Sequence, residues 1–151
     1  MNPQALLYLN VEVAQGAQAL HHQVFEIRKT FRPLMASSVY KRFSSRDRVW
    51  RIEVVLAVEF SKEQDLVEMR DQVAALGGEV LMVEGELRVD PVLPLPHPRL
   101  LLDSFILKMA SECAPYWEHR VKQQTLQALA QQNPAQDSAE FLTQGEGLIN
   151  V

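Results

Sequence analysis

Residues 93–117 read LPLPHPRLLLDSFILKMASECAPYW and decide how the second half of this chain folds. Three prolines stand within residues 94–98, and each removes a backbone donor and fixes φ, so this part cannot lie inside a helix or a central strand. The pattern predicts a stiff, extended crossing over residues 91–99, with His97 held between two prolines. An apolar run with helical spacing follows and ends before Pro115. A rigid arm carrying a histidine, followed by a docked helix, is typical of the wall of a site.

Upstream of this stretch, hydrophobic periodicity predicts two units of strand, helix and strand. The first unit comprises a strand over 5–13, a helix over 17–31 and a strand over 34–43. The second comprises a strand over 49–60, a helix over 62–76 with Ser61 as its N-cap, and a strand over 79–89, or two short strands that turn at Glu84-Gly85. This order predicts an α+β ferredoxin-like sandwich (β-α-β-β-α-β) with a four-stranded, mainly antiparallel sheet. The nearly continuous apolar run of the third strand predicts that it is central, and the two long helices should cover one face.

The C-terminal part is predicted to add a helical extension, with a last helix over residues 121–132. From residue 133 onward the composition is polar and contains glycine, which indicates a flexible tail. We therefore expect a domain over residues 1–132 and a tail over residues 133–151.

Composition places the chain among ordinary globular proteins. The 151 residues are 47% hydrophobic and 23% charged, and the formal net charge of −4 gives no overall attraction to nucleic acid or acidic membranes. No apolar run of membrane-spanning length and no leader pattern is visible. The single cysteine, Cys113, excludes an intramolecular disulfide and fits a reducing compartment, as a small buried hydrophobe. We expect a cytoplasmic protein.

One family resemblance follows from these residues. The motif LPHPRL at residues 95–100, then Phe105-Ile106-Leu107, Ala114-Pro115 and His119, resembles the C-terminal third of the 6-hydroxymethyl-7,8-dihydropterin pyrophosphokinases (HPPK) of folate synthesis. The resemblance extends more weakly over residues 5–130. It implies the ferredoxin-like fold already predicted and an ATP- and Mg²⁺-dependent transfer of pyrophosphate to a pterin.

The family's metal site does not reappear in this sequence. The resemblance implies a Trp-Gly-Pro-Arg loop leading into Asp-x-Asp, whose two carboxylates lie on one sheet face and share metal ions. Here the chain passes from Gly77 directly into Gly78-Glu79-Val80. Counting back from Gly85 places Gly78 and Val80 where the two aspartates would stand, and Glu79 on the opposite face. A slip of one residue would bring Glu79 into register, but still alone.

Two further positions depart from the family pattern. An asparagine that contacts the pterin falls at about Glu53, and an arginine that precedes the ring-stacking phenylalanine is matched by Asp103. A carboxylate facing a triphosphate is repulsive where attraction is needed. We therefore expect no resident cofactor and no metal site, in a family member that kept its scaffold and lost its chemistry.

His97 and Phe105 are the residues of the family pattern that remain. His97 is either a phosphate contact, as the resemblance implies, or a ring that caps a turn between prolines, and we favour the second reading. Phe105 is either a stacking surface for a planar heterocycle or a core residue of an apolar helix.

A basic cluster on the predicted hairpin is the only candidate for a new site. Five cations stand in eleven residues with only Asp47 opposing them, beside Phe43 and Trp50. The cations are Lys41, Arg42, Arg46, Arg48 and Arg51. Such a cluster could bind a phosphate-bearing ligand or nucleic acid, or it could be a solvated loop.

Three functional hypotheses remain open. The chain is a catalytically degenerate HPPK homologue that acts as a binding module, an active HPPK with unorthodox metal ligands, or a basic-loop module for an anionic partner. The counts of carboxylates and arginines favour the first. Its expected partner is a pterin, a nucleotide or another anionic small molecule, with no membrane and with nucleic acid disfavoured by the net charge.

Overall fold

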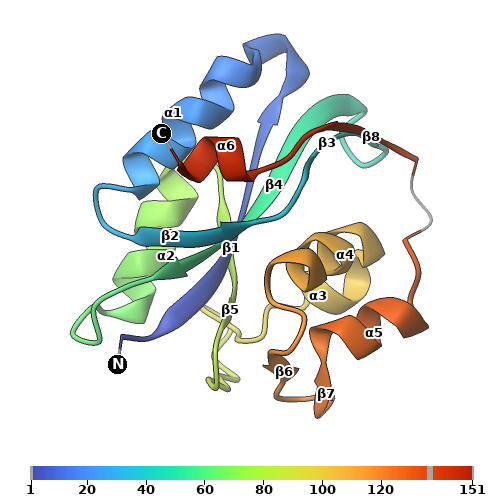
Figure 1. The fold of residues 1–151 in the computed structure, drawn as a ribbon. Coiled ribbons are helices and arrows are strands. Elements are labelled where there is room, and N and C mark those ends of the chain that lie inside the picture. The colour runs from blue at the N-terminus through green and yellow to red at the C-terminus, as the bar shows by residue number, and fades with distance from the viewer. Residues whose placement is uncertain (1, 136–137, 151) are drawn as a thin grey trace.

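The computed structural model describes residues 2–135 and 138–150, and the centre of its sheet is β4 (Val49–Glu59). This strand pairs antiparallel with β1 on one side and with β2 and β3 on the other. The full order is β5-β1-β4-β3-β8, with β2 paired to β4 (Figure 1). The remaining strands of this sheet are β1 (Gln4–Glu12), β2 (Arg32–Ala36), β3 (Val39–Ser44), β5 (Glu79–Val83) and β8 (Ala139–Thr143). The predicted α+β fold and the central third strand are confirmed.

The sheet has six strands where the sequence predicts four. The segment expected as one strand over 34–43 is divided into β2 and β3, which pair with successive stretches of the long β4. The strand expected over 79–89 ends at Val83, because the chain turns at Gly85, where φ is +80° and glycine is favoured.

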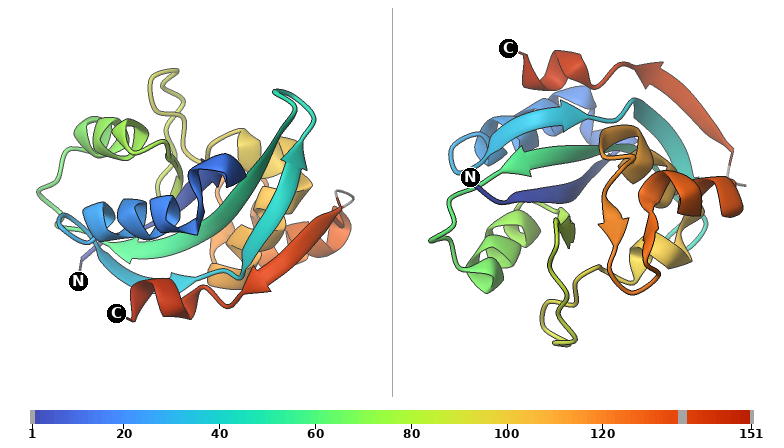
Figure 2. Two further views of the ribbon diagram at one scale, coloured as in Figure 1. Left: turned by 90° about the horizontal axis from the view of Figure 1, so that it is seen from above. Right: turned by 60° about the horizontal axis from the view of Figure 1, so that its bottom comes forward.

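Helices cover both faces of the sheet (Figure 2). On one face lie the predicted long helices, α1 (Ala17–Ile27) and α2 (Leu66–Ala75), whose buried side chains share a core with alternate residues of β1 and β4. On the other face lie α4 (Ser104–Cys113) and α5 (Leu126–Gln132). The smaller elements are a 3-10 turn at Val13–Gln15, α3 (Arg99–Leu102), β6 (Glu118–His119), β7 (Gln124–Thr125) and α6 (Glu146–Ile149). Within the described residues, no helix combines the length and apolar character needed to cross a bilayer.

Helix α2 begins later than the sequence predicts. Its N-cap is Asp65, whose carboxylate accepts a hydrogen bond from the Val67 amide at 3.2 Å. The expected cap, Ser61, instead pairs through its hydroxyl with Glu63 in the preceding turn. Both residue types cap helices well, so the choice between them depends on where the backbone first becomes helical.

The described part of the C-terminal segment docks on the domain, which differs from the flexible tail expected from residue 133. Strand β8 pairs with β3 at the sheet edge, and α6 places Leu148 and Ile149 in the core beside α1. Residues 136, 137 and 151 of this segment lie outside the described residues. The few apolar residues of this polar segment are enough to anchor it because an open strand edge offers unpaired backbone groups.

Gly145 provides a test of this docking. A Cβ atom at this position would lie 2.0 Å from the Ser37 carbonyl oxygen and 2.7 Å from the Ala36 Cβ, whereas one at Gly147 would meet nothing within 4 Å. We expect Gly145→Ala to lower the free energy of unfolding by about 2 kcal/mol through overpacking. In a chain of this size that corresponds to a melting temperature lower by roughly 4–8 °C. Gly147→Ala is the matched control and should be neutral or slightly stabilising. Equal melting temperatures for the two variants would contradict the docked arrangement.

Candidate functional site

A cavity of about 710 Å³ opens beside the β3–β4 hairpin. Its floor comes from the ends of β1, β3 and β4 and one wall from α3 and the start of α4. The volume is that of a small-molecule site. The lining residues are Tyr8, Asn10, Arg42, Phe43, Ser44, Ser45, Arg46, Asp47, Trp50, Arg51, Glu53, Arg99, Asp103 and Ser138.

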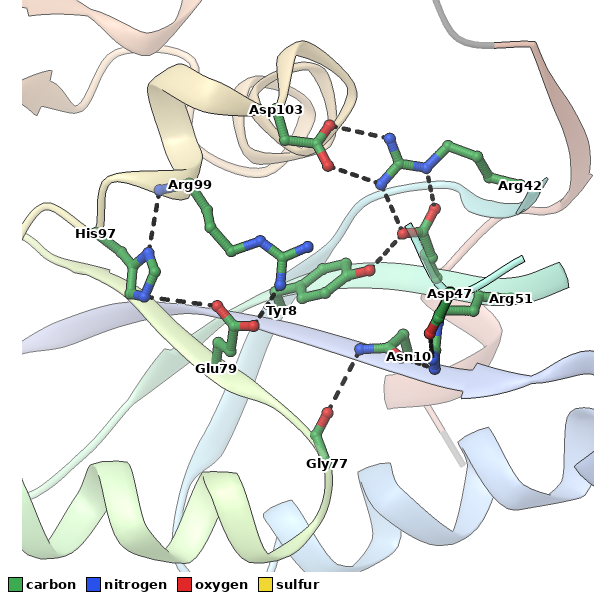
Figure 3. A network of polar contacts seen from close by, with 11 residues as sticks. Tyr8, Asn10, Arg42, Asp47, Arg51, Gly77, Glu79, His97, Arg99 and Asp103 are labelled. Atoms are coloured by element: carbon green, nitrogen blue, oxygen red, sulfur yellow. Dashed lines mark hydrogen bonds and ion pairs between the residues drawn. The ribbon is translucent and has the colours of Figure 1, made fainter. Parts of the chain in front are cut away.

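A buried guanidinium, that of Arg42, organises the floor (Figure 3). Its Nε and Nη2 each donate to Glu53 at 2.8 Å, and its Nη1 and Nη2 each donate to Asp103 at 2.9 Å. Tyr8 donates a short hydrogen bond to the same Glu53 carboxylate. Arg42 is 8% exposed and Glu53 is 2% exposed, so these charges are largely removed from water.

Hydrogen bonds and charge within the floor act against the effect of burial on Asp103 and Arg42. Burial alone would raise the pKa of Asp103, but hydrogen bonds and charge from Arg42 hold it below its usual value. Burial would lower the pKa of Arg42, but hydrogen bonds to Asp103 and Glu53 raise it instead. Burial, and then the charge of Glu53, raise the pKa of Tyr8. The tyrosine is therefore a neutral donor, and Arg42 and Asp103 keep their charges at neutral pH.

Asp103 has a second role, because it is the N-cap of α4. One carboxylate oxygen accepts from the amides of Phe105 and Ile106 at 3.0 and 3.1 Å. The sequence predicts that this carboxylate faces, and repels, a bound triphosphate. In the structure it faces Arg42 and the helix terminus, so its charge is already compensated.

Phe105 lies in the core rather than on the cavity wall. It is 4% exposed, and the guanidinium carbon of Arg42 lies 5.0 Å from its ring centroid. Tyr40 meets the same ring edge to face at 4.9 Å, and the Lys108 ammonium lies 5.3 Å from it. The stacking surface of this ring is thus covered by the chain's own cation.

The register of β5 differs from the one obtained by counting back from Gly85. Leu81 is an extra residue between the pairs Leu6–Met82 and Leu7–Val80. Such a bulge reverses the alternation upstream of it. Val80 therefore packs into the core under α1 and α2, and Glu79 faces the other side of the sheet, toward α3. This arrangement agrees with the alignment shifted by one residue, in which a single carboxylate, that of Glu79, faces the site.

Glu79 is held by the Pro-His-Pro-Arg segment. It forms an ion pair with Arg99, whose guanidinium carbon lies 5.3 Å from the Tyr8 ring centroid. The other carboxylate oxygen lies 3.6 Å from Nε2 of His97, while Nδ1 of His97 accepts from the Arg99 amide at 3.1 Å. His97 therefore caps the turn into α3, as favoured from the sequence, and lies outside the cavity lining. Within residues 2–135 and 138–150, no three His, Cys, Asp or Glu side chains are grouped to hold a metal ion.

The hairpin cations are separated by the structure into paired and unpaired groups. Arg51 donates to Asn10 at 2.9 Å and forms an ion pair with Asp47, so it is fixed at the cavity wall. Hydrogen bonds from Ser44 and then Arg51 hold the pKa of Asp47 below its usual value. Arg42 is a structural cation, contrary to its predicted place in a free basic cluster. For Arg46 and Arg48 the described part of the chain provides no ion pair or hydrogen bond to the guanidinium.

Of the seven predicted ligand residues, the structure brings four to the cavity: Arg42, Arg46, Trp50 and Arg51. Tyr8, Asn10 and Arg99 also line it and were not predicted. Strand alternation along β1 places Tyr8 and Asn10 on one face, and this signal was available in the sequence. Their meeting with the hairpin required the register between β1 and β4, which joins residues more than 40 positions apart.

Comparison with known proteins supports the fold. No family model matches the chain, and no curated protein matches it. Among solved structures, it is similar to wild-type HPPK-DHPS of Plasmodium falciparum with pterin and p-hydroxybenzoate, at 11% identity and a TM-score of 0.67. It is also similar to the same enzyme with SDX-DHP, at 9% identity and a TM-score of 0.68. The matches cover 87% of this chain and 42% and 44% of those chains, so this chain spans less than half of their length. The chain therefore has an HPPK-like fold.

Removing the charge of Glu53 tests the buried network. Breaking a buried ion pair typically costs about 3–5 kcal/mol, and because Asp103 still pairs with Arg42 we expect about 3 kcal/mol for Glu53→Gln. Glu59 on the same strand forms a 3.6 Å pair with the exposed Arg32, so Glu59→Gln is the matched control and should cost less than about 1 kcal/mol. Denaturant unfolding of both variants measures the difference. Similar costs would show that the Arg42 network contributes little.

The pH dependence of stability tests the environment of His97. Burial lowers its pKa from the ordinary 6.5, Glu79 opposes this shift and Arg99 adds to it. As pH falls below about 6.5, the unfolded chain therefore takes up a proton before the folded one, and stability is lost. His97→Asn keeps an acceptor for the Arg99 amide and should make the loss of stability between about pH 7.5 and 5.5 shallower. The same substitution at the exposed His21 is the control. An unchanged slope in His97→Asn would contradict the assignment.

Proposed function

We propose that this chain is an HPPK-like scaffold that no longer transfers pyrophosphate and that acts as a binding module. The observation that carries the proposal is the place of Arg42. The resemblance matches Phe105 to the ring-stacking phenylalanine and Glu53 to the pterin-contacting asparagine. The Arg42 guanidinium, a planar group with several donors, lies against the Phe105 ring and donates two hydrogen bonds to the Glu53 carboxylate. The chain's own side chain thus takes the space where the resemblance implies the pterin.

The phosphate side of the family site is also altered. Where the resemblance implies two aspartates, the site-facing position carries Glu79, already paired with Arg99 and close to His97. Transfer of this kind depends on metal carboxylates and cations that stabilise phosphate charge. The neighbouring HPPK-DHPS enzymes are larger, and what they do is a guide to this chain only through the shared fold.

The direct test is a transfer assay. We expect no Mg²⁺-dependent formation of AMP from ATP and 6-hydroxymethyl-7,8-dihydropterin, because losing even one such electrostatic contact typically costs about 10²–10³ in rate. An authentic HPPK in the same assay is the positive control. Turnover that requires Mg²⁺ and disappears in Glu79→Ala would overturn the proposal and favour an active enzyme with unorthodox ligands.

Arg42→Ala tests the reason for the loss. Because Arg42→Ala alone leaves two carboxylates without their cation, it is combined with Glu53→Asn. If the guanidinium occupies the space of the pterin, pterin binding measured by fluorescence should be absent in the natural chain and appear in this double variant. Lys41→Ala, on the opposite face of the same strand and over the Trp50 ring, is the matched control for charge. Pterin binding by the natural chain would show that Arg42 does not block the recess.

A second candidate function, binding of an anionic ligand by the hairpin, is favoured by Arg46, a lining cation for which the described residues provide no partner. The two functions are compatible, because the ion pairs of the floor are made by Arg42 and not by Arg46.

A further inference from the structure

We propose that the rim of the cavity, at the tip of the β3–β4 hairpin, binds a small aromatic phosphate such as a nucleoside monophosphate. In this arrangement Arg46 holds the phosphate beside the hydroxyl of Ser45, and the aromatic ring lies on Trp50. The inference rests on the proposed role as a binding module, and it names the ligand class and the side chains that meet it.

The charge distribution around the cavity selects the rim for the anion. On the floor, one guanidinium, that of Arg42, faces the two carboxylates of Glu53 and Asp103, so the floor offers no excess positive charge. Arg51 is matched with Asp47. Arg46 is the lining cation for which the described residues provide no partner, and its fork of donors suits phosphate oxygens.

The backbone at Arg48 is a second, independent observation. This residue has φ +60°, in the left-handed region that glycine or asparagine adopts more easily, and its amide donates to the Ser44 carbonyl at 2.8 Å to close the turn. Local backbone preferences therefore do not account for an arginine at this position. Arg48 does not line the cavity, but it stands two residues from Arg46 on the same turn, where Asp47 is already paired with Arg51.

The aromatic surface at the rim indicates what accompanies the phosphate. Trp50 is 49% exposed and Phe43 is 41% exposed, and their rings meet edge to face at 5.4 Å. The Lys41 ammonium lies over one face of the Trp50 ring, 5.3 Å from its centroid, so the ring of the ligand would lie on the other face of the indole. An exposed indole beside Arg46, for which the described part of the chain shows no partner, suits a planar ring that carries an anion.

The size of the cavity and the net charge of the chain favour a small molecule over a polymer. About 710 Å³ matches a nucleotide-sized ligand. A protein of net charge −4 repels the long anionic backbone of a nucleic acid away from the hairpin. A nucleotide at the end of a single-stranded nucleic acid has the same base and phosphate as a free nucleoside monophosphate, so the test compares these two ligands.

The experiment is calorimetric titration of the full chain with AMP, inorganic phosphate, adenosine and a short single-stranded oligonucleotide. We expect AMP to bind more tightly than phosphate or adenosine alone, and its affinity to fall as salt rises from about 0.05 M to about 0.5 M, because exposed charges are screened. Equal affinities for AMP and phosphate would overturn the aromatic contact. Tighter binding of the oligonucleotide than of AMP would overturn the small-molecule ligand.

Two double variants locate the site. Arg46→Ser with Arg48→Ser should weaken AMP binding about tenfold or more, since lost charge-assisted contacts to phosphate are strong, and should leave the melting temperature almost unchanged. Lys62→Ser with Arg120→Ser removes the same charge from exposed positions elsewhere and should leave the affinity unchanged. Equal effects of the two pairs, or no AMP binding by the natural chain, would overturn the hairpin site. Neither result bears on transfer activity, whereas Mg²⁺-dependent AMP formation would overturn the loss of catalysis and leave the hairpin site standing.

Discussion

The fork made by Arg42 is the interaction on which the site depends. Through Glu53 and Asp103 this one guanidinium ties β3 to the central strand and both of them to the start of α4. It also lies against the ring of Phe105, 5.0 Å from the ring centroid. Pairing two carboxylates with one cation inside a protein is stable only when the remaining oxygens are satisfied, and the Tyr8 hydroxyl and the α4 amides satisfy them.

Local patterns were enough to predict the architecture. The order of strands and helices, the central position of the strand over 49–60 and the two helices on one face all follow from periodicity within single segments. The division of residues 34–43 into β2 and β3 did not follow, because the pairing of both with one long neighbour is a tertiary effect. The docking of β8 could not be predicted from local patterns either, because an edge strand forms only through its pairing with a neighbouring strand, here β3.

The site was less predictable, for reasons that particular residues make clear. Glu79 faces the site only because of the bulge at Leu81, a feature without a strong sequence signal. The sequence alone predicts that the charge of Asp103 repels a ligand. In the structure the same carboxylate caps α4 and pairs with Arg42. A count of charges along the chain therefore overstates the charge that a ligand would meet. Residues 61 positions apart, Arg42 and Asp103, compensate each other once the chain is folded.

The departures from the family pattern at positions 53 and 103 form one coupled set, because both side chains pair with Arg42. An arginine at position 103, as the family pattern has it, would remove the cap of α4 and set a second guanidinium against Arg42. An asparagine at position 53 would leave Arg42 with one carboxylate in place of two. Neither change alone would restore a family-like site, because each would first break a buried pair. The HPPK-like fold itself rests on the two apolar clusters on either side of the sheet, and Arg42, Glu53 and Asp103 belong to neither of them.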